Sequence, residues 1–146
     1  NEVAFHTFSF FDSGKAPSKT EPERFYHGFV LGLIVDLSDK YQITSNRESG
    51  FGRYDVMIEP KDKTDKAFIL EFKVHDPDLG EKTLEDTAQA ALRQIKDKGY
   101  TAALVVKGFD LKQIRRYGFA FRGKQVLIQS DNSEYDKSEI IFDRKG

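Results

Sequence analysis

The sequence predicts an α/β fold that is built on one mixed β-sheet. Three apolar segments with short polar connections, residues 41–44, 53–59 and 67–74, are typical of antiparallel strands that follow one another in a meander. An amphipathic helix then leads into a further apolar segment, residues 101–106, and a strand–helix–strand unit places its two strands parallel in one sheet. A sheet that contains both kinds of neighbour is a mixed sheet.

The length and composition predict a single folded domain over residues 1–146. The 146 residues are 38% hydrophobic and 13% aromatic, which suits a packed core and not a disordered chain. The absence of cysteine excludes disulfides, thiolate zinc sites and a cysteine nucleophile. The formal net charge of -1 provides no global basic field, so a nucleic acid would have to bind to a local basic patch.

The chain carries no apolar run of membrane-spanning length and no signal-peptide pattern. We therefore expect a cytoplasmic protein. Because the chain begins with Asn1 and not with Met, we also expect it to be part of a longer protein.

The N-terminal part is expected to contain a strand, a loop and a long helix. Residues 2–11 are rich in aromatic side chains and alternate weakly, which favours a strand, and residues 12–21 contain glycine and two prolines, which favours a loop. Pro22 is well placed at the start of a helix that runs to about Asp39. The apolar stripe of this helix contains Phe25, Phe29, Leu33 and Leu37.

The two central strands, residues 53–59 and 67–74, each combine apolar residues with charged ones. Successive side chains of a strand point to opposite faces, so Glu71 and Lys73 are expected side by side, with Phe72 on the other face. In the preceding strand the same alternation separates Asp55 from its apolar neighbours. The polar connection at residues 45–52 and the charged turn at residues 60–66 join the meander.

The second half of the chain predicts a capped helix between strands. After a loop at residues 75–80, Thr83 is a good N-cap, and Asp86 stands three residues later, close to a capping-box arrangement. The helix is expected to run to Lys98, with Gly99 as its stop. The segment that follows, residues 101–106, is the expected strand parallel to residues 68–73.

The C-terminal part predicts a hairpin and a tail. Residues 113–121 alternate aromatic and other side chains, a turn follows at residues 122–124, and residues 125–128 are expected to pair back. The remaining residues, 129–146, are mostly polar, and we expect a loosely attached tail.

An acid-x-Lys string occurs four times, and we expect only one copy to end a buried strand. The four copies are Glu59-Pro-Lys61, Glu71-Phe-Lys73, Asp110-Leu-Lys112 and Asp143-Arg-Lys145. Burial of charged groups is costly unless each has a partner or a metal, so the copy at Glu71 and Lys73 needs an explanation.

Asp55 is expected beside Glu71 if the two central strands pair through the turn. Two converging carboxylates repel each other unless a divalent cation lies between them, and oxygen ligands favour magnesium or manganese. A lysine such as Lys73 beside that cation can orient water or stabilise the charge of a phosphoryl transition state. A structural salt-bridge cluster at a sheet edge explains the same residues equally well at this point.

These residues together resemble the PD-(D/E)XK nuclease superfamily. The resemblance is carried by Asp55, by Glu71-x-Lys73, and by Gln94 and Tyr100 on and after the following helix. The closer resemblance is to a branch found at the C-terminus of bacterial proteins that begin with an AAA-ATPase-like domain. The run from Glu48 to Asp55, Glu-Ser-Gly-Phe-Gly-Arg-Tyr-Asp, is its most specific part, and the resemblance covers about residues 21–128.

The resemblance implies a restriction-endonuclease-like core of the order αβββαβ, with a mixed central sheet flanked by helices. It also implies hydrolysis of DNA phosphodiester bonds that depends on Mg²⁺ or Mn²⁺. The implied metal ligands are Asp55, Glu71 and the first-helix acid Glu23, while Lys73 would position the attacking water and Gln94 would orient the Lys73 end of the site. The further candidates that it implies are Glu48, Arg53, Tyr100 and His27. Tyr54 stands before Asp55, where the superfamily's motif has proline.

Two alternatives to an active nuclease remain at this point. One is a catalytically inactive nucleic-acid-binding or regulatory module, and the near-neutral net charge favours it mildly because dedicated DNA binders are often more basic. The other is a domain that mainly docks onto its own ATPase-like domain. The one dense basic cluster late in the chain contains Lys112, Arg115 and Arg116.

Overall fold

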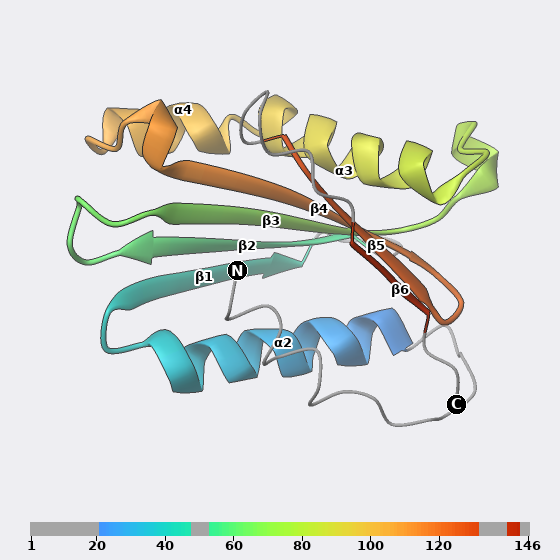
Figure 1. Cartoon of the computed structure of the whole chain (residues 1–146), viewed down its shortest axis with the longest axis horizontal. Coiled ribbons are helices and arrows are strands. Elements are labelled where there is room, and N and C mark those ends of the chain that lie inside the picture. Colours follow the sequence, from blue (N-terminus) through green and yellow to red (C-terminus); the bar gives the residue numbers. More distant parts are fainter. Residues whose placement is uncertain (1–20, 48–52, 132–139, 144–146) are drawn as a thin grey trace.

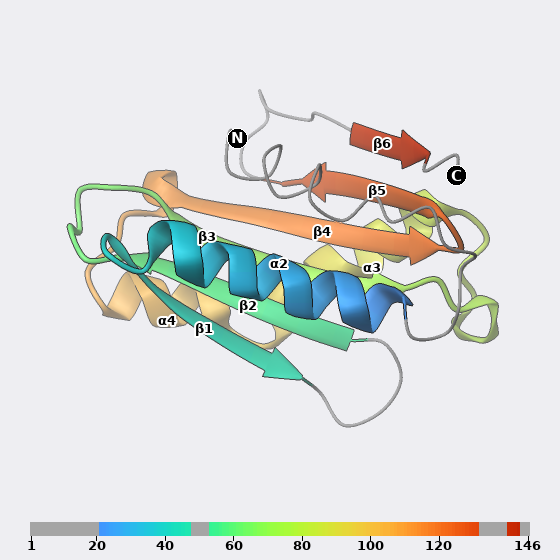
Figure 2. The same cartoon turned by 90° about the horizontal axis from the view of Figure 1, so that it is seen from below.

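The computed structural model describes residues 21–47, 53–131 and 140–143. Within these residues six strands form one sheet, whose spatial order from β1 to β6 is also their order in the chain. The strands are β1 (Tyr41–Arg47), β2 (Arg53–Pro60), β3 (Ala67–Val74), β4 (Ile114–Arg122), β5 (Gln125–Ser130) and β6 (Ile140–Asp143). β3 and β4 pair parallel, and the other neighbours pair antiparallel, so the sheet is mixed. Figure 2, viewed from the side of one helix, shows this order.

Helices cover both faces of the sheet (Figure 1). The long helix α2 (Glu21–Leu37) lies on one face, and α3 (Leu84–Asp97) and the short α4 (Tyr100–Val106) lie on the other. Two single turns of 3-10 helix, η1 (Pro77–Leu79) and η2 (Leu111–Gln113), lie in the connections. The predicted α/β class, with a mixed sheet flanked by helices, is therefore confirmed.

An aromatic core fills the space between α2 and the sheet. Phe72 of β3 is at its centre, with its ring centroid 4.5 Å from that of Phe119 on β4 and 5.6 Å from that of Phe29 on α2. Phe25 and Phe121 join the same group of rings. None of the helices in the described part of the chain combines the length and hydropathy that a membrane span requires.

The opposite face of the sheet is packed closely against α3. Ile69, Ile95 and Ile114 are fully buried there. A Cβ atom on Gly118 of β4 would lie only 2.6 Å from the backbone oxygen of Ala88 on α3. The absence of a side chain at this position therefore allows α3 to approach the sheet.

The ends of α3 follow the expected caps. Thr83 accepts a hydrogen bond from the Asp86 backbone, and the Asp86 side chain accepts one from the Thr83 backbone, which completes a capping box. At the other end Lys98 is the C-cap, and Gly99 takes a φ of 70°.

The segment at residues 101–106 is a helix, α4, and the prediction of a strand there is wrong. A short apolar run does not distinguish a strand from a helix by its periodicity, and the run contains two alanines, which are good helix formers. Leu104 is its buried anchor, whereas Val106 is exposed. The strand parallel to β3 is β4, which follows α4 and η2, so the expected crossover exists but is longer.

The C-terminal hairpin is confirmed, and β5 pairs antiparallel with β4 around Gly123. The expectation of a loosely attached tail is wrong for residues 140–143, because β6 pairs with β5. β1 extends to Arg47, further than predicted. The predicted strand at residues 2–11 and nearly all of the predicted loop at residues 12–21 lie outside the described residues.

Candidate active site

Strands β2 and β3 bring Asp55 and Glu71 directly opposite each other. The two residues are partners in the antiparallel register, and directly opposite side chains in such a pair have Cβ atoms about 4.5–5.5 Å apart. Both residues are buried, with exposed fractions of 2% and 0%. Two buried carboxylates at this separation repel each other strongly unless a cation lies between them.

The side chain of Lys98 reaches both carboxylates from the end of α3. Its Nζ lies 2.9 Å from Asp55 Oδ2 and 3.0 Å from Glu71 Oε1, with Glu71 Oε2 at 3.3 Å. One cation therefore contacts both acids at once. Sequence reasoning missed Lys98, because a lysine in the last turn of a helix is usually solvated. The one available signal was that Lys98 follows Gln94 by four residues and so shares its side of the helix.

Asp55 is held in place by two further donors. The Tyr100 hydroxyl donates to Oδ2 at 3.0 Å, and the Asn46 amide donates to Oδ1 at 3.1 Å. Burial, together with the hydrogen bond to Asp55 and its negative charge, raises the pKa of Tyr100, so the phenol remains a donor. Tyr100 was among the candidates from the sequence, whereas Asn46 was not.

The backbone at Asp55 is fixed from the other side of the sheet. The Tyr26 hydroxyl of α2 donates to the Asp55 carbonyl oxygen at 3.2 Å. Burial raises the pKa of Tyr26, so this group also stays protonated. Helices from both faces therefore contribute to the position of this one residue.

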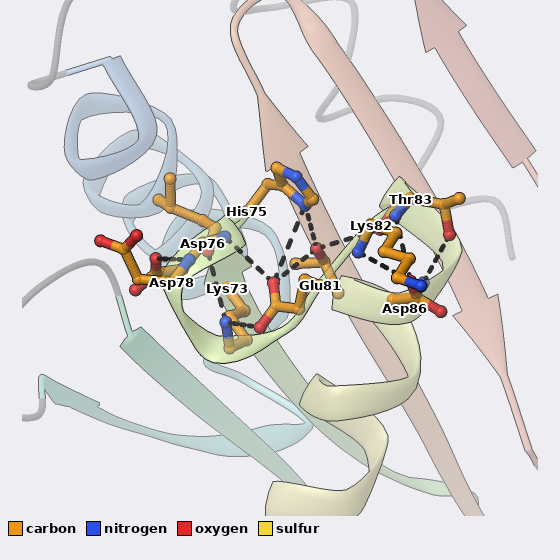
Figure 3. A network of polar contacts seen from close by, with 10 residues as sticks. Lys73, His75, Asp76, Asp78, Glu81, Lys82, Thr83 and Asp86 are labelled. Carbon is orange, nitrogen blue, oxygen red and sulfur yellow. Dashed lines mark hydrogen bonds and ion pairs between the residues drawn. The ribbon is translucent and has the colours of Figure 1, made fainter.

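Lys73 is bound to a different acid, Glu81, in the loop before α3 (Figure 3). Their ion pair is buried, and the Lys73 ammonium also donates to the Val74 carbonyl oxygen at 3.4 Å. The Glu81 carboxylate accepts two more hydrogen bonds, from the Thr87 hydroxyl at 2.7 Å and from the Asp76 backbone at 3.0 Å. The sequence signal for Glu81 was weak. A buried lysine needs an acidic partner, but several acidic residues follow β3, and the sequence does not distinguish between them.

The carboxylate of Glu81 is anionic in the folded protein. Burial raises its pKa, but the hydrogen bonds from Lys73, Thr87 and the Asp76 backbone outweigh that effect, so the pKa lies below its usual value. His75 lies at the edge of the same network, with Nδ1 2.7 Å from the Thr87 hydroxyl and 3.8 Å from Glu81 Oε1. The result is a fixed position for the Lys73 ammonium.

The other residues that the sequence singled out lie in several places. Gln94 is half-buried on α3. Lys98, four residues later on the same side of the helix, is the residue whose head group contacts the two acids. Arg53 is half-buried and opposite Lys73 in the register. His27 is exposed on α2, where its ring packs edge-on against Tyr26.

Two of the candidate acids cannot be placed at the site. Glu48 lies outside the described residues, and so does the side chain of Glu23. The backbone of Glu23 belongs to the first turn of α2, the helix on the face opposite α3.

The donor atoms of Asp55 and Glu71 fit a hard divalent cation. Among the described residues, no group of three or more histidine and acidic side chains is arranged so that it could hold a metal ion. The oxygens of Asp55 and Glu71 already share one cation, the Lys98 ammonium, which shows that the pair can face a common positive charge. Carboxylate oxygens are the preferred ligands of Mg²⁺ and Mn²⁺.

The sequence profile of the PD-(D/E)XK nuclease superfamily matches residues 21–131, which is most of the chain. The protein therefore belongs to the PD-(D/E)XK nuclease superfamily. Members of this superfamily are usually nucleases, which hydrolyse phosphodiester bonds, and they typically use divalent metal ions. Searches of curated proteins and of solved structures gave no significant match.

Proposed function

We propose that this protein is a nuclease that hydrolyses DNA phosphodiester bonds with Mg²⁺ or Mn²⁺. The observation that carries the proposal is the pair of buried acids, Asp55 and Glu71, which face each other and contact one cation. Membership of a nuclease superfamily supports the same chemistry. The choice of DNA and of these two metals rests on the resemblance of the motifs.

In this proposal Asp55 and Glu71 hold the metal ion. A divalent cation bound there would supply a water of lowered pKa and would stabilise negative charge on the phosphate. Tyr100 and Asn46 keep the Asp55 carboxylate in position, as hydrogen-bond partners of metal ligands commonly do.

Lys73 is proposed to donate a hydrogen bond to the attacking water or to a phosphate oxygen. Its side chain emerges on the same face of β3 as Glu71, two residues later. An ammonium group has three N–H donors, and among the described residues Glu81 and Val74 accept from it. One donor therefore remains for water or substrate, and the ion pair with Glu81 fixes the direction in which it points.

The test is cleavage of plasmid, single-stranded DNA and RNA with Mg²⁺, with Mn²⁺ and with EDTA. Asp55→Asn and Glu71→Gln should each abolish metal-dependent cleavage, because each removes a charged ligand. Glu85→Gln is the matched control, since Glu85 is an exposed acid in the first turn of α3. Cleavage that persists in EDTA, or in both ligand variants, would refute the proposal.

A catalytically inactive nucleic-acid-binding module is the second candidate function. The observation in its favour is that Lys98 already contacts both acids, so they have a cationic partner in the fold without a metal. DNA binding with neither metal binding nor cleavage would support this alternative over the nuclease.

We also propose that this domain is attached to an AAA-ATPase-like domain in a longer bacterial protein. The support is the run from Glu48 to Asp55, which resembles the branch with that arrangement. The mass of the intact protein in its source cells tests this point, since a protein no longer than 146 residues would contradict it.

A further inference from the structure

We propose that Lys98 is a built-in competitor for the metal site, which a divalent cation must displace before the site is complete. This inference rests on the proposed function, because it concerns the same two acids. It goes further by assigning a role to a residue outside the D…ExK motif.

The ammonium of Lys98 and a shared metal ion need the same space. A metal bound by Asp55 and Glu71 must lie between their oxygens, at about 2.0–2.6 Å from each. Lys98 Nζ already lies between them, at 2.9 Å and 3.0 Å from one oxygen of each acid. Two cations do not share this gap, so binding of the metal requires the ammonium to leave.

The charge balance favours this exchange. With Lys98 in place, the two carboxylates share the single positive charge of one ammonium. A divalent ion in the same place would bring twice that charge. Lys98 therefore stabilises the metal-free protein but offers the two acids less positive charge than a divalent cation does.

The head group of Lys98 can move to solvent, whereas that of Lys73 is held in place. The Lys98 side chain is 14% exposed and belongs to the C-cap of α3, where a cation is favoured by the carbonyl end of the helix dipole. Its long stem can carry the head group to solvent without any movement of the backbone. The Lys73 side chain is only 4% exposed and is held by Glu81. Of these two lysines, Lys98 is the one that can be displaced.

Metal affinity, measured by calorimetry with Mn²⁺ and no DNA, tests the inference directly. Lys98→Met keeps most of the stem and removes the charge, so the Kd for Mn²⁺ should fall roughly tenfold or more, since the competing cation is gone. The matched control is Lys96→Met, which removes an equal charge from an exposed position on the same helix and should leave the Kd nearly unchanged. Equal or weaker Mn²⁺ binding by Lys98→Met would overturn the inference.

Thermal unfolding in EDTA and in Mn²⁺ provides a second readout. Lys98→Met should unfold at a lower temperature than the unaltered chain in EDTA, and Mn²⁺ should raise its Tm by more. Lys98→Gln serves the same purpose if the methionine variant does not fold. If Mn²⁺ raises the Tm of both variants by no more than it raises the Tm of the unaltered chain, the result would count against displacement of Lys98 by the metal.

The outcomes for the inference and for the nuclease proposal are separate. Tighter Mn²⁺ binding by Lys98→Met without any DNA cleavage by the unaltered chain would support the inference and refute the nuclease. Metal-dependent cleavage by the unaltered chain, combined with unchanged Mn²⁺ affinity in Lys98→Met, would support the nuclease and refute the inference. No Mn²⁺ binding by either chain would overturn both.

Discussion

At the scale of single residues, the site depends on how each buried charge is paired. Asp55 and Glu71 share Lys98, and Lys73 has Glu81, so each buried lysine or acid of this region contacts an opposite charge. The adjacency of Asp55 and Glu71 was predictable, because strand alternation and a short turn determine both face and register. The partners Lys98 and Glu81 were not, because they come from the far end of α3 and from a loop, whose positions depend on tertiary packing.

Glu81→Gln should destabilise the protein in a pH-dependent way. The change leaves Lys73 buried without an anion, and removal of one partner of a buried pair costs about 3–5 kcal/mol. Because the folded-state pKa of Glu81 lies below its ordinary value of 4.5, its stabilising effect is complete above that value and is lost as the pH falls through the folded-state pKa. The difference in unfolding free energy between the variant and the unaltered chain should therefore be largest near neutral pH and shrink in acid.

Urea unfolding near neutral pH and at several acidic values measures this difference. Glu85→Gln, an exposed change, should alter stability by no more than about 0.5 kcal/mol at any of them. A Glu81→Gln effect of constant size across the pH range would show that the charge of Glu81 is not what stabilises Lys73.

At the scale of elements, the close contact between α3 and β4 positions Lys98. α3 must lie near the sheet for its last turn to reach β2 and β3, and Gly118 makes that approach possible. The sequence predicted the amphipathic face and the caps of α3, but not α4, since propensity and a short apolar run are weak guides when tertiary packing decides. The sequence therefore predicted correctly a helical crossover between two parallel strands, but the predicted crossover was too short.

Gly118→Ala should destabilise the protein by about 1–3 kcal/mol, the usual cost of overpacking. Its Cβ would lie 2.6 Å from the Ala88 backbone oxygen, and 3.2 Å from atoms of both Ala91 and Leu92, so α3 would have to move. Chemical denaturation measures the loss. In Gly123→Ala the new Cβ meets open space but the residue has a φ of 58°, so this control isolates backbone strain from steric clash. An unchanged midpoint for Gly118→Ala would show that α3 is free to shift.

At the scale of the whole molecule, one sheet joins two cores of different character. The α2 side is a cluster of aromatic rings, and the α3 side is mainly aliphatic, with the charged site at its margin. β3 belongs to both, since Phe72 points into the aromatic core while its neighbours Glu71 and Lys73 point to the opposite face, where they contact Lys98 and Glu81 respectively. The core was predictable from the apolar pattern, whereas the pairing of β6 with β5 was not, because residues 140–143 are a short apolar run in a polar context.

Phe72→Ala should cost about 3–5 kcal/mol, because it leaves a large cavity among rings that collapse poorly. Phe72 is 1% exposed and packs against rings from both α2 and β4. Since both cores share β3, unfolding followed by aromatic fluorescence and by circular dichroism should remain a single transition at a lower denaturant concentration. Two separate transitions would mean that the two cores unfold independently.

The position of Lys98 in the chain also has a consequence for folding. The β2–β3 hairpin is local and can form early, but it then brings Asp55 and Glu71 together with no cation between them. Lys98 lies 27 residues beyond Glu71 and reaches the pair only when α3 docks. The repulsion between the two acids therefore destabilises the β2–β3 hairpin until α3 docks. We expect completion of the hairpin and docking of α3 to occur as one cooperative step. The same two acids that suit a metal ion would in this way delay the hairpin until the rest of the α3 face is in place.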